Sequence, residues 1–297
     1  MTKRVLIAGG DGLLGRSLAG HLRDAGCNVI VTTRRCPVKE SAILLDLVAE
    51  PTTWPELPDV DAAVICAAAT SIKQCADDPT TSAKVNVGAT IELAERLIRR
   101  GTFVLFVSSN QVFDGTSPLV DRTARYCPVS AYGRQKAVAE AAILAMGARA
   151  AILRVSKILA PNQPMLIEWL CNLRKGTVIR PFLDFTLAPV SVDHATAMIE
   201  ALVAARLPGI FQLSGAHDVS YVELAYTIAR RDRSDRSLIR PCPAIAAESG
   251  FEVLPRYTSM DMARERRELG VAAPESWAII NDVVASLVEA KAPRQVA

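Results

Sequence analysis

A tyrosine and a lysine spaced four residues apart are the first feature of this chain that suggests chemistry. Tyr132 and Lys136 lie in the alanine-rich stretch SAYGRQKAVAE, residues 130–140, which predicts a helix. Side chains four apart on a helix share one face. A neighbouring ammonium stabilises a tyrosinate, so the pair predicts a phenol with a lowered pKa that exchanges protons near neutral pH. Such a pair is also found as a plain surface contact, so it needs support from the rest of the chain.

A glycine-rich turn near the start supplies that support. The apolar run RVLIAG leads into GGDGLLG, in which Gly9, Gly12 and Gly15 form a G-x-x-G-x-x-G pattern. Glycines after a first strand permit a tight turn whose backbone N–H groups reach a pyrophosphate at a helix N-terminus. We therefore expect a dinucleotide there, with Leu13 and Leu14 opening the helix beside it; the alternative is an ordinary glycine-rich turn.

The second predicted strand ends in TTRR, where NAD-selective folds place an acidic residue for the ribose 2′-hydroxyl. Arg34 and Arg35 stand there instead and can clamp a 2′-phosphate, which favours NADP(H) over NAD(H). Two solvated loop arginines are the alternative. Asp46, with Leu47 after the third strand, is a candidate acceptor for the adenine or a local cap.

The elements that must position these residues alternate between strands and helices. Apolar runs rich in β-branched residues predict strands, and amphipathic segments between them predict helices. The strands are expected at 4–9, 28–33, 41–46, 61–69, 103–109 and 150–156, and the helices near 13–25, 79–99 and 131–146. This is the pattern of an α/β fold with a doubly wound, Rossmann-type parallel sheet. In such folds ligands bind at the carboxyl edge, where Ser108 and Ser109 end the strand 103–109.

The second half has a different rhythm and predicts a smaller C-terminal substrate lobe. We expect residues 1–155 to form the dinucleotide-binding domain. Residues 156–297 would form mainly the substrate lobe, with late strands and helices returning to the first domain. The expected elements are a helix at 165–176, a short strand near 177–182, a helix opening at Asp193 as N-cap, a strand at 209–214 and a helix at 220–231, while 234–260 has no clear assignment.

The composition excludes several classes of protein. The 34 basic and 31 acidic residues give a net charge of +3 without a long block of one sign, which argues against a nucleic-acid partner. Seven scattered cysteines without a C-x-x-C pair argue against a disulfide framework or a metal site and favour reduced thiols in the cytoplasm. No apolar stretch reaches the length of a membrane span, and the N-terminal run is too short for a signal peptide.

Several motifs together resemble the extended short-chain dehydrogenase/reductases. These are the glycine turn, AAA at 67–69, VNVGAT at 85–90, SSNQVFDG at 108–115 and PVSAYGRQKAVAE at 128–140. The stretch 108–115 and the length are most similar to the sugar-nucleotide branch typified by dTDP-4-dehydrorhamnose reductase. The chain departs from that branch at Asn110 and Gln111, where an aromatic residue is common, and it lacks the branch's glutamine-containing loop in RPFLDFTLAPVSV.

The resemblance implies roles for individual residues. Tyr132 would be the general acid, Lys136 its partner and the holder of the nicotinamide ribose, and Ser109 the hydrogen-bond donor to the reacting oxygen, with Ser108 in support. Asn86 would help to order a water beside the lysine, or would be a polar residue on the buried side of its helix. Ala67, Ala68 and Ala69 would line the cofactor.

The resemblance also implies a reaction and its neighbours. We expect NADP(H)-dependent reduction of a keto group on a nucleotide-linked sugar, with NAD possible as cofactor and a homodimer possible. The alternatives are an epimerase or dehydratase that retains its cofactor and a non-catalytic NADP(H)-binding regulatory subunit. Arg154 would be structural or at the substrate rim, and Lys157, Met165, Trp169 and the 180–190 segment are candidate substrate neighbours, although Met165 and Trp169 also fit core packing.

Overall fold

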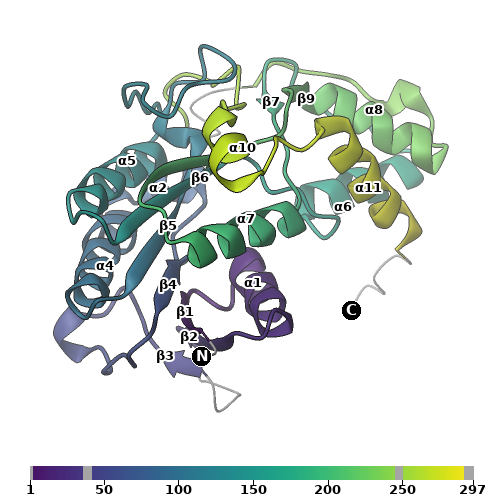
Figure 1. Ribbon diagram of the computed structural model, residues 1–297. Coiled ribbons are helices and arrows are strands. Elements are labelled where there is room, and N and C mark those ends of the chain that lie inside the picture. The colour runs from purple at the N-terminus through teal and green to yellow at the C-terminus, as the bar shows by residue number, and fades with distance from the viewer. Residues whose placement is uncertain (1–2, 36–41, 245–249, 291–297) are drawn as a thin grey trace.

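A seven-stranded parallel sheet forms the centre of the protein. The computed structural model describes residues 3–35, 42–244 and 250–290. The strand order is β3-β2-β1-β4-β5-β6-β8, and every neighbouring pair is parallel. The predicted doubly wound, Rossmann-type fold is confirmed (Figure 1). The strands are β1 (Arg4–Ala8), β2 (Asn28–Thr33), β3 (Ala42–Leu44), β4 (Ala62–Ile65), β5 (Phe103–Ser109), β6 (Ala150–Val155) and β8 (Gly209–Leu213).

The order of strands in the sheet reverses at β1: after β3 the chain crosses back, and β4 pairs with the other side of β1. From β1 the sheet grows to β2 and β3 on one side, and to β4, β5, β6 and β8 on the other. The turns after β1 and β4 therefore meet, and the backbone N–H groups of Cys66 and Ala67 both donate to the carbonyl of Ala8 at 2.9 Å. In doubly wound sheets this switch point, at the carboxyl ends of the strands, is where ligands bind.

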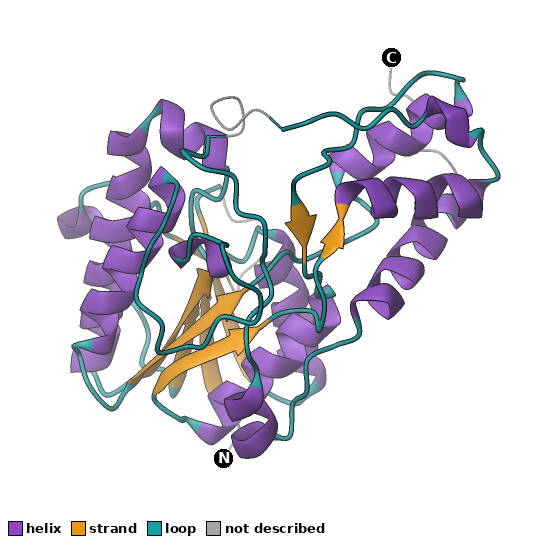
Figure 2. Ribbon diagram, turned by 90° about the horizontal axis from the view of Figure 1, so that it is seen from above, coloured by secondary structure: helices purple, strands orange, loops and turns teal. Residues whose placement is uncertain are grey.

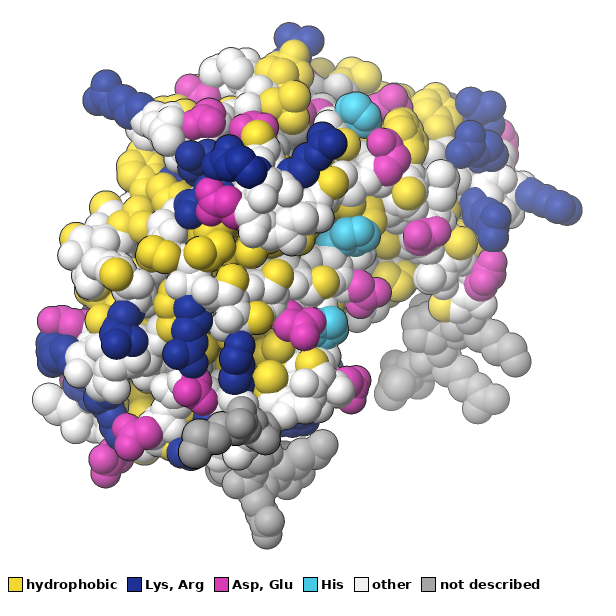
Figure 3. All heavy atoms as spheres, viewed as in Figure 1, with side chains coloured by type: hydrophobic (Ala, Val, Ile, Leu, Met, Phe, Trp, Pro, Cys, Tyr) yellow, Lys and Arg dark blue, Asp and Glu magenta, His cyan; other side chains and the backbone are white. Residues whose placement is uncertain are grey.

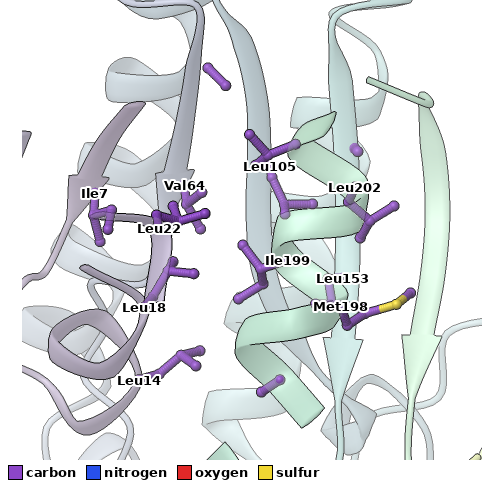
Figure 4. Close-up of a cluster of buried hydrophobic side chains, with 14 of the residues drawn as sticks. Ile7, Leu14, Leu18, Leu22, Val64, Leu105, Leu153, Met198, Ile199 and Leu202 are labelled. Carbon is purple, nitrogen blue, oxygen red and sulfur yellow. The ribbon is translucent and has the colours of Figure 1, made fainter. Parts of the chain in front are cut away.

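Two pairs of helices cover the two faces of the sheet. The helices α1 (Leu13–Asp24) and α7 (Val192–Ala205) lie on one face, and α4 (Thr90–Arg99) and α5 (Ala131–Leu144) lie on the other (Figure 1). On the first face, leucines spaced four apart along α1 point toward β1 and β4, while α7 packs over β5 and β6 (Figure 4). Burial of these apolar faces fixes both helices on the sheet.

The predicted helix at 79–99 is helical throughout but is not one regular α-helix. It consists of α3 (Pro79–Ala83), a π-helical turn η2 (Lys84–Ala89) and α4. The short helix α2 (Ile72–Asp77), capped by Ser71, precedes it and was not expected from the sequence. Asn86 lies within the π-helical turn, a distortion that is frequent at functional sites.

A second cluster of helices lies beside the sheet domain. It contains α6 (Pro164–Arg174), α8 (Tyr221–Asp232) and α11 (Ser276–Glu289), which share an apolar core with the antiparallel pair β7 (Thr186–Leu187) and β9 (Val219–Ser220). Figure 2 shows this small pair standing apart from the main sheet. The helix α10 (Ala263–Leu269) returns to β8, so late segments of the chain contribute to both parts. Short 3-10 turns are η1 (Pro51–Thr53), η3 (Asn110–Val112) and η4 (Arg236–Leu238).

Two local predictions for the second half are wrong. The stretch 177–182 makes only isolated bridges, Ile179 to Ile239 and Phe182 to Cys242, and Pro181 cannot donate to a ladder. The helix expected to open at Asp193 is capped by Ser191, whose hydroxyl accepts from the N–H of His194 at 3.1 Å; Asp193 lies inside the first turn. Of the unassigned stretch 234–260, residues 245–249 lie outside the described residues.

Charged side chains of both signs are interspersed over the face shown in Figure 3. Among residues 3–35, 42–244 and 250–290, no helix has the length and apolar character needed to span a bilayer.

Candidate active site

The helix α5 brings Tyr132 and Lys136 to the carboxyl end of β5. Ser130 caps the helix by accepting from the N–H of Gly133 at 3.1 Å, which places Tyr132 in the first turn. Both side chains are buried, Tyr132 at 8% and Lys136 at 2% exposed. Lys136 Nζ donates to the carbonyl oxygen of Val107 at 2.9 Å and lies 5.8 Å from the centre of the Tyr132 ring. The two residues are therefore fixed against the sheet and are not a surface pair.

The glycine between them is required by a close approach to the turn after β5. A β-carbon added to Gly133 would lie 2.1 Å from the carbonyl oxygen of Gln111, which belongs to η3. No side chain larger than hydrogen fits at that distance. The first turn of α5 can therefore pack directly on the turn that begins at Ser109, which brings Tyr132 and Ser109 together.

Burial raises the pKa of Tyr132 instead of lowering it. Among the described residues the nearby thiol of Cys75 raises this pKa further, and a side-chain hydrogen bond with Ser109 opposes the shift. The prediction that Lys136 gives the phenol a lowered pKa is thus wrong for the protein alone, because burial disfavours the tyrosinate and the Lys136 ammonium is not among the described groups that shift this pKa. Tyr132 keeps its proton at neutral pH, which is the form that a general acid needs.

Burial acts in the opposite direction on the lysine. It lowers the pKa of Lys136 to about 8, while the carboxylate of Glu140 and the thiols of Cys66 and Cys75 oppose that shift. Glu140 follows Lys136 by four residues and so lies on the same helical face. The lysine therefore keeps its proton at pH 7 but loses it at a lower pH than an exposed lysine does.

The two serines at the end of β5 have different surroundings. The Ser109 hydroxyl caps η3 by accepting from the N–H of Gln111 at 3.3 Å and lies 3.3 Å from Asn110 Oδ1. The Ser108 hydroxyl is buried and has no hydrogen-bond partner among the described residues. A buried hydroxyl usually finds a partner, so Ser108 leaves hydrogen-bonding capacity at the ligand edge of the sheet.

Asn86 is the centre of a buried network. Its Oδ1 accepts from the N–H of Ala69 at 2.8 Å, and its Nδ2 donates to the carbonyl of Ala69 at 2.9 Å and to Gln135 Oε1 at 2.7 Å. Gln135 in turn donates to the Ser82 hydroxyl at 2.8 Å. Both donors of the Asn86 amide are therefore used by the protein. Its observed role is to fasten the turn after β4 to α5, the helix of Tyr132.

The glycine turn fits an anionic ligand. Gly9 has φ +93°, and a β-carbon on it would lie 2.8 Å from the Ala67 backbone; one on Gly15 would lie 2.2 Å from the Gly9 carbonyl oxygen. Gly12 caps α1 without a side-chain hydrogen bond, and the first turn of α1 contains no acidic residue. The N–H groups of Gly9, Gly10 and Gly12 donate within the protein, whereas those of Leu13 and Leu14 have no acceptor among the described residues and are thus offered to a negative group. Together with the unpartnered Ser108 hydroxyl, they fit a dinucleotide.

The other predicted cofactor residues are less constrained. Arg34 and Arg35 are exposed after β2 and form no ion pair with any described residue. Asp46 is exposed and its Oδ1 accepts from the N–H of Val48 at 2.9 Å, which closes a turn and caps no helix. Leu47 is buried in the core below α4. The three alanines at 67–69 are half-buried beside the glycine turn.

Arg154 has a structural place. It is 1% exposed and pairs with Glu140 at 2.7 Å, and Glu140 also accepts from the hydroxyl of Tyr126 at 3.0 Å. The Arg154 guanidinium lies over the rings of Phe113 and Tyr126, at 4.9 and 5.2 Å from their centres. The pair fastens the segment after β5 to α5 and β6.

The candidate substrate neighbours lie in the second cluster. Met165 and Trp169 pack against its apolar core, and Trp169 meets Tyr221 edge-on at 6.3 Å. Lys157 is exposed, yet the surrounding protein lowers its pKa. The six cysteines among the described residues are free thiols; Cys36 lies outside them. Nowhere in the described chain do three or more His, Cys, Asp or Glu side chains gather in a way that could hold a metal ion.

Comparison with known proteins then places the chain in a family. The protein-family model of the RmlD substrate binding domain matches residues 3–288. The chain belongs to the RmlD substrate binding domain family. The resemblance to the dTDP-4-dehydrorhamnose reductase branch of the extended short-chain dehydrogenase/reductases is confirmed.

Proteins similar to this chain include a reductase and a subunit of a methionine adenosyltransferase. The dTDP-4-keto-6-deoxy-D-glucose reductase of Streptomyces niveus is 28% identical over 284 residues, covering 93% of this chain and 94% of the relative. The methionine adenosyltransferase 2 subunit beta of Xenopus tropicalis is 34% identical over 261 residues, covering 80% of this chain and 75% of the relative. Sequence similarity alone thus leaves both a reductase and a subunit of another enzyme as candidate roles for this chain.

Among solved structures, a dTDP-4-dehydrorhamnose reductase from Bacillus anthracis in complex with NADP shares the fold. It has a TM-score of 0.81 at 19% identity and covers 96% of this chain and 99% of its own. MoeE5, solved with UDP-glucose and NAD, has a TM-score of 0.80 at 22% identity and covers 96% and 97%.

Three features of the candidate site escaped the sequence analysis. These are the contact of Gly133 with Gln111, the bond of Gln135 to Asn86 and the pairing of Glu140 with Arg154. Only Glu140 had a detectable signal, since it continues the four-residue spacing of Tyr132 and Lys136.

Proposed function

We propose that this protein reduces a keto group on a nucleotide-linked sugar with NADP(H). The observation that carries the proposal is the meeting of Ser109, Tyr132 and Lys136 at the carboxyl end of β5, on the edge of the sheet that also holds the glycine turn. A proton donor, a second hydroxyl and a buried cation beside a dinucleotide turn are the parts that carbonyl reduction requires.

The residues divide the work as follows. Ser109 and Tyr132 hydrogen-bond the carbonyl oxygen of the sugar, which polarises the C=O bond. The nicotinamide, when bound, supplies a hydride to the carbonyl carbon. As the C–O bond becomes an alkoxide, the Tyr132 hydroxyl gives it a proton, and the product is the alcohol. Lys136, held by the carbonyl of Val107, stabilises the tyrosinate left behind and lies where a ribose hydroxyl can contact it.

The choice of NADP(H) rests on Arg34 and Arg35. Both are exposed at the end of β2 without ion pairs among the described residues, so both are available to a 2′-phosphate. An exchangeable NADP(H) suits a reductase that consumes its cofactor. An epimerase or dehydratase, the alternative, profits from a cofactor that stays bound. The free thiols fit a reducing compartment, so we place the protein in the cytoplasm.

A second candidate role has support of its own. The 34% identity to the methionine adenosyltransferase 2 subunit beta of Xenopus tropicalis favours a role as a subunit of another enzyme, for which the alternative expected from the sequence is a non-catalytic NADP(H)-binding protein. The complete set of Ser109, Tyr132 and Lys136 argues against that role, because a subunit that only binds has no need of a proton donor.

A panel of nucleotide sugars and 4-keto sugars, scored for NADPH oxidation by the purified protein, decides between these roles. We expect one NADPH to be consumed for each keto sugar reduced by protein isolated without cofactor. Interconversion of two sugar nucleotides without net NADPH consumption would establish an epimerase. NADPH binding without turnover across the panel would favour the subunit role. In the same assay, combined Arg34→Ala and Arg35→Ala should weaken NADPH binding.

A further inference from the structure

The glycine turn contains an acidic side chain that points to the end of β2. Asp11 stands between Gly10 and Gly12, and its carboxylate accepts a hydrogen bond from the hydroxyl of Thr33. Thr33 is the last residue of β2 and is buried, whereas Asp11 is exposed. A residue of the pyrophosphate turn is thus fastened to the neighbouring strand end.

Two further hydrogen bonds join the same two segments. The N–H of Gly9 donates to the hydroxyl of Thr32 at 3.1 Å, and the N–H of Gly10 donates to the carbonyl of Thr32 at 2.9 Å. A β-carbon on Gly10 would lie 2.7 Å from that of Val31, so the turn lies directly on β2. The position of the Asp11 carboxylate is therefore set by the backbone of two elements.

This position is the one that the sequence left without an acid. Dinucleotide folds that take NAD place a carboxylate at the end of the second strand, where it accepts from the ribose 2′-hydroxyl. In this chain β2 ends in two threonines and is followed by Arg34 and Arg35. Asp11 brings a carboxylate to the same strand end from the other side of the crevice.

We propose that Asp11 determines cofactor specificity by accepting a hydrogen bond from the 2′-hydroxyl of NAD(H), so that the site takes NAD(H) as well as NADP(H). The inference rests on the dinucleotide site of the proposed function. Thr33 holds both the acidic and the basic residue in place, because its hydroxyl donates to the Asp11 carboxylate and accepts from the N–H of Arg35 at 3.0 Å. A 2′-phosphate is attracted by the two arginines and repelled by the Asp11 carboxylate. The repulsion reduces the difference in affinity between NADP(H) and NAD(H).

Binding titrations of the full chain with NADH and with NADPH test this, using tryptophan fluorescence or calorimetry without substrate. Asp11→Asn keeps the size of the side chain and removes its charge. We expect it to weaken NADH about tenfold, the usual effect of losing a hydrogen bond to a charged group, and to leave NADPH unchanged or tighter. Asp24→Asn, an equal change of charge at the exposed far end of α1, should alter neither affinity.

A pair of variants at Thr33 checks the geometry. Thr33→Ser keeps the hydroxyl and should keep NADH binding, whereas Thr33→Val fits the same buried space and should weaken NADH in the direction of Asp11→Asn. Equal weakening of both cofactors by Asp11→Asn, or unchanged NADH binding, would overturn the proposal. Protein that binds both cofactors as predicted but reduces no keto sugar would refute the proposed reduction and leave the role of Asp11 intact.

Discussion

The carbonyl oxygen of Gln111 lies 2.1 Å from where a β-carbon on Gly133 would be. This contact packs α5 directly on the turn after β5. It thereby keeps Tyr132 close to Ser109. The glycine in the middle of the tyrosine–lysine spacing thus has a packing reason, and five predictions follow from this contact and its neighbours.

Gly133→Ala should destabilise the protein and abolish activity, because the added methyl group must push the first turn of α5 away from η3. Overpacking of this kind costs about 1–3 kcal/mol. Gly20→Ala is the matched control: it lies in α1 with nothing within 4 Å of an added β-carbon, and should stabilise by up to about 1 kcal/mol. Urea unfolding measures both, and a Gly133→Ala protein of normal stability and activity would contradict the contact.

Tyr132→Phe should keep dinucleotide affinity and lose turnover on the order of 100-fold or more, because the ring still packs while the proton donor is gone. Tyr226→Phe, half-buried in α8 beside Arg236, should leave turnover unchanged. The measurement is the rate at saturating keto sugar, and near-normal turnover of Tyr132→Phe there would rule out the role of general acid.

Lys136 should make stability rise with pH. Its pKa is lowered to about 8 in the folded protein from an ordinary value of 10.5. Between these values the unfolded chain still binds the proton and the folded protein has released it, so the free energy of unfolding increases with pH; below about 8 both states are protonated and the slope vanishes. Relative to Lys136→Met, the wild type should gain on the order of 3 kcal/mol between pH 7 and 11. Parallel pH profiles of the two proteins in urea unfolding would contradict the lowered pKa.

Breaking the pair of Glu140 and Arg154 should cost about 3–5 kcal/mol, since either single change leaves a charge buried without its partner. Glu140→Leu and Arg154→Met each test this by urea unfolding. The combination Glu140→Leu with Arg154→Met removes both charges and should recover part of the loss. Losses that simply add in the double variant would show that the two residues are not coupled.

Asn86→Ala should loosen the turn at 67–69 and weaken dinucleotide binding. It removes the acceptor of the Ala69 N–H and the donor to Gln135 Oε1, at about 1–3 kcal/mol for each group left without a partner, while the Ala69 carbonyl still accepts from the Cys75 thiol at 3.4 Å. Asn281→Ala, exposed on α11, serves as the control. Hydrogen exchange at the Ala69 N–H should become faster in Asn86→Ala and stay unchanged in Asn281→Ala. Unchanged protection in Asn86→Ala would mean that the turn at 67–69 keeps its structure without Asn86.

The sheet and the position of the site were predictable because their signals are local. Each strand is a short, continuous apolar run, and the glycine turn directly follows the first of them. The same reasoning failed at Asp193, where two good capping residues stand close together and Ser191 has the better geometry. It also failed at 177–182, where β-branched residues predict a strand but the described residues form only isolated bridges to Ile239 and Cys242.

The electrostatics of the site could not be predicted, because they depend on burial. The spacing of Tyr132 and Lys136 shows that they share a face but not that the face is buried, and burial reverses the expected direction of the tyrosine pKa. The bond of Asp11 to Thr33 joins residues 22 apart in sequence through the sheet, and no local pattern announces it.

The π-helical turn at Lys84–Ala89 makes the orientation of Asn86 depend on the number of residues in this helix as well as on their types. A π-turn carries one residue more than an α-helix needs for the same path. Losing one residue there would let the segment close into an uninterrupted helix, which is the more regular structure. It would also turn whatever precedes the deletion by about 100° relative to α4, and so swing the amide of Asn86 or the segment before it out of aim. The extra residue of the π-turn therefore fixes the rotation of the preceding segment relative to α4. This rotation keeps the Asn86 side chain directed at the site, although the helix is less regular there.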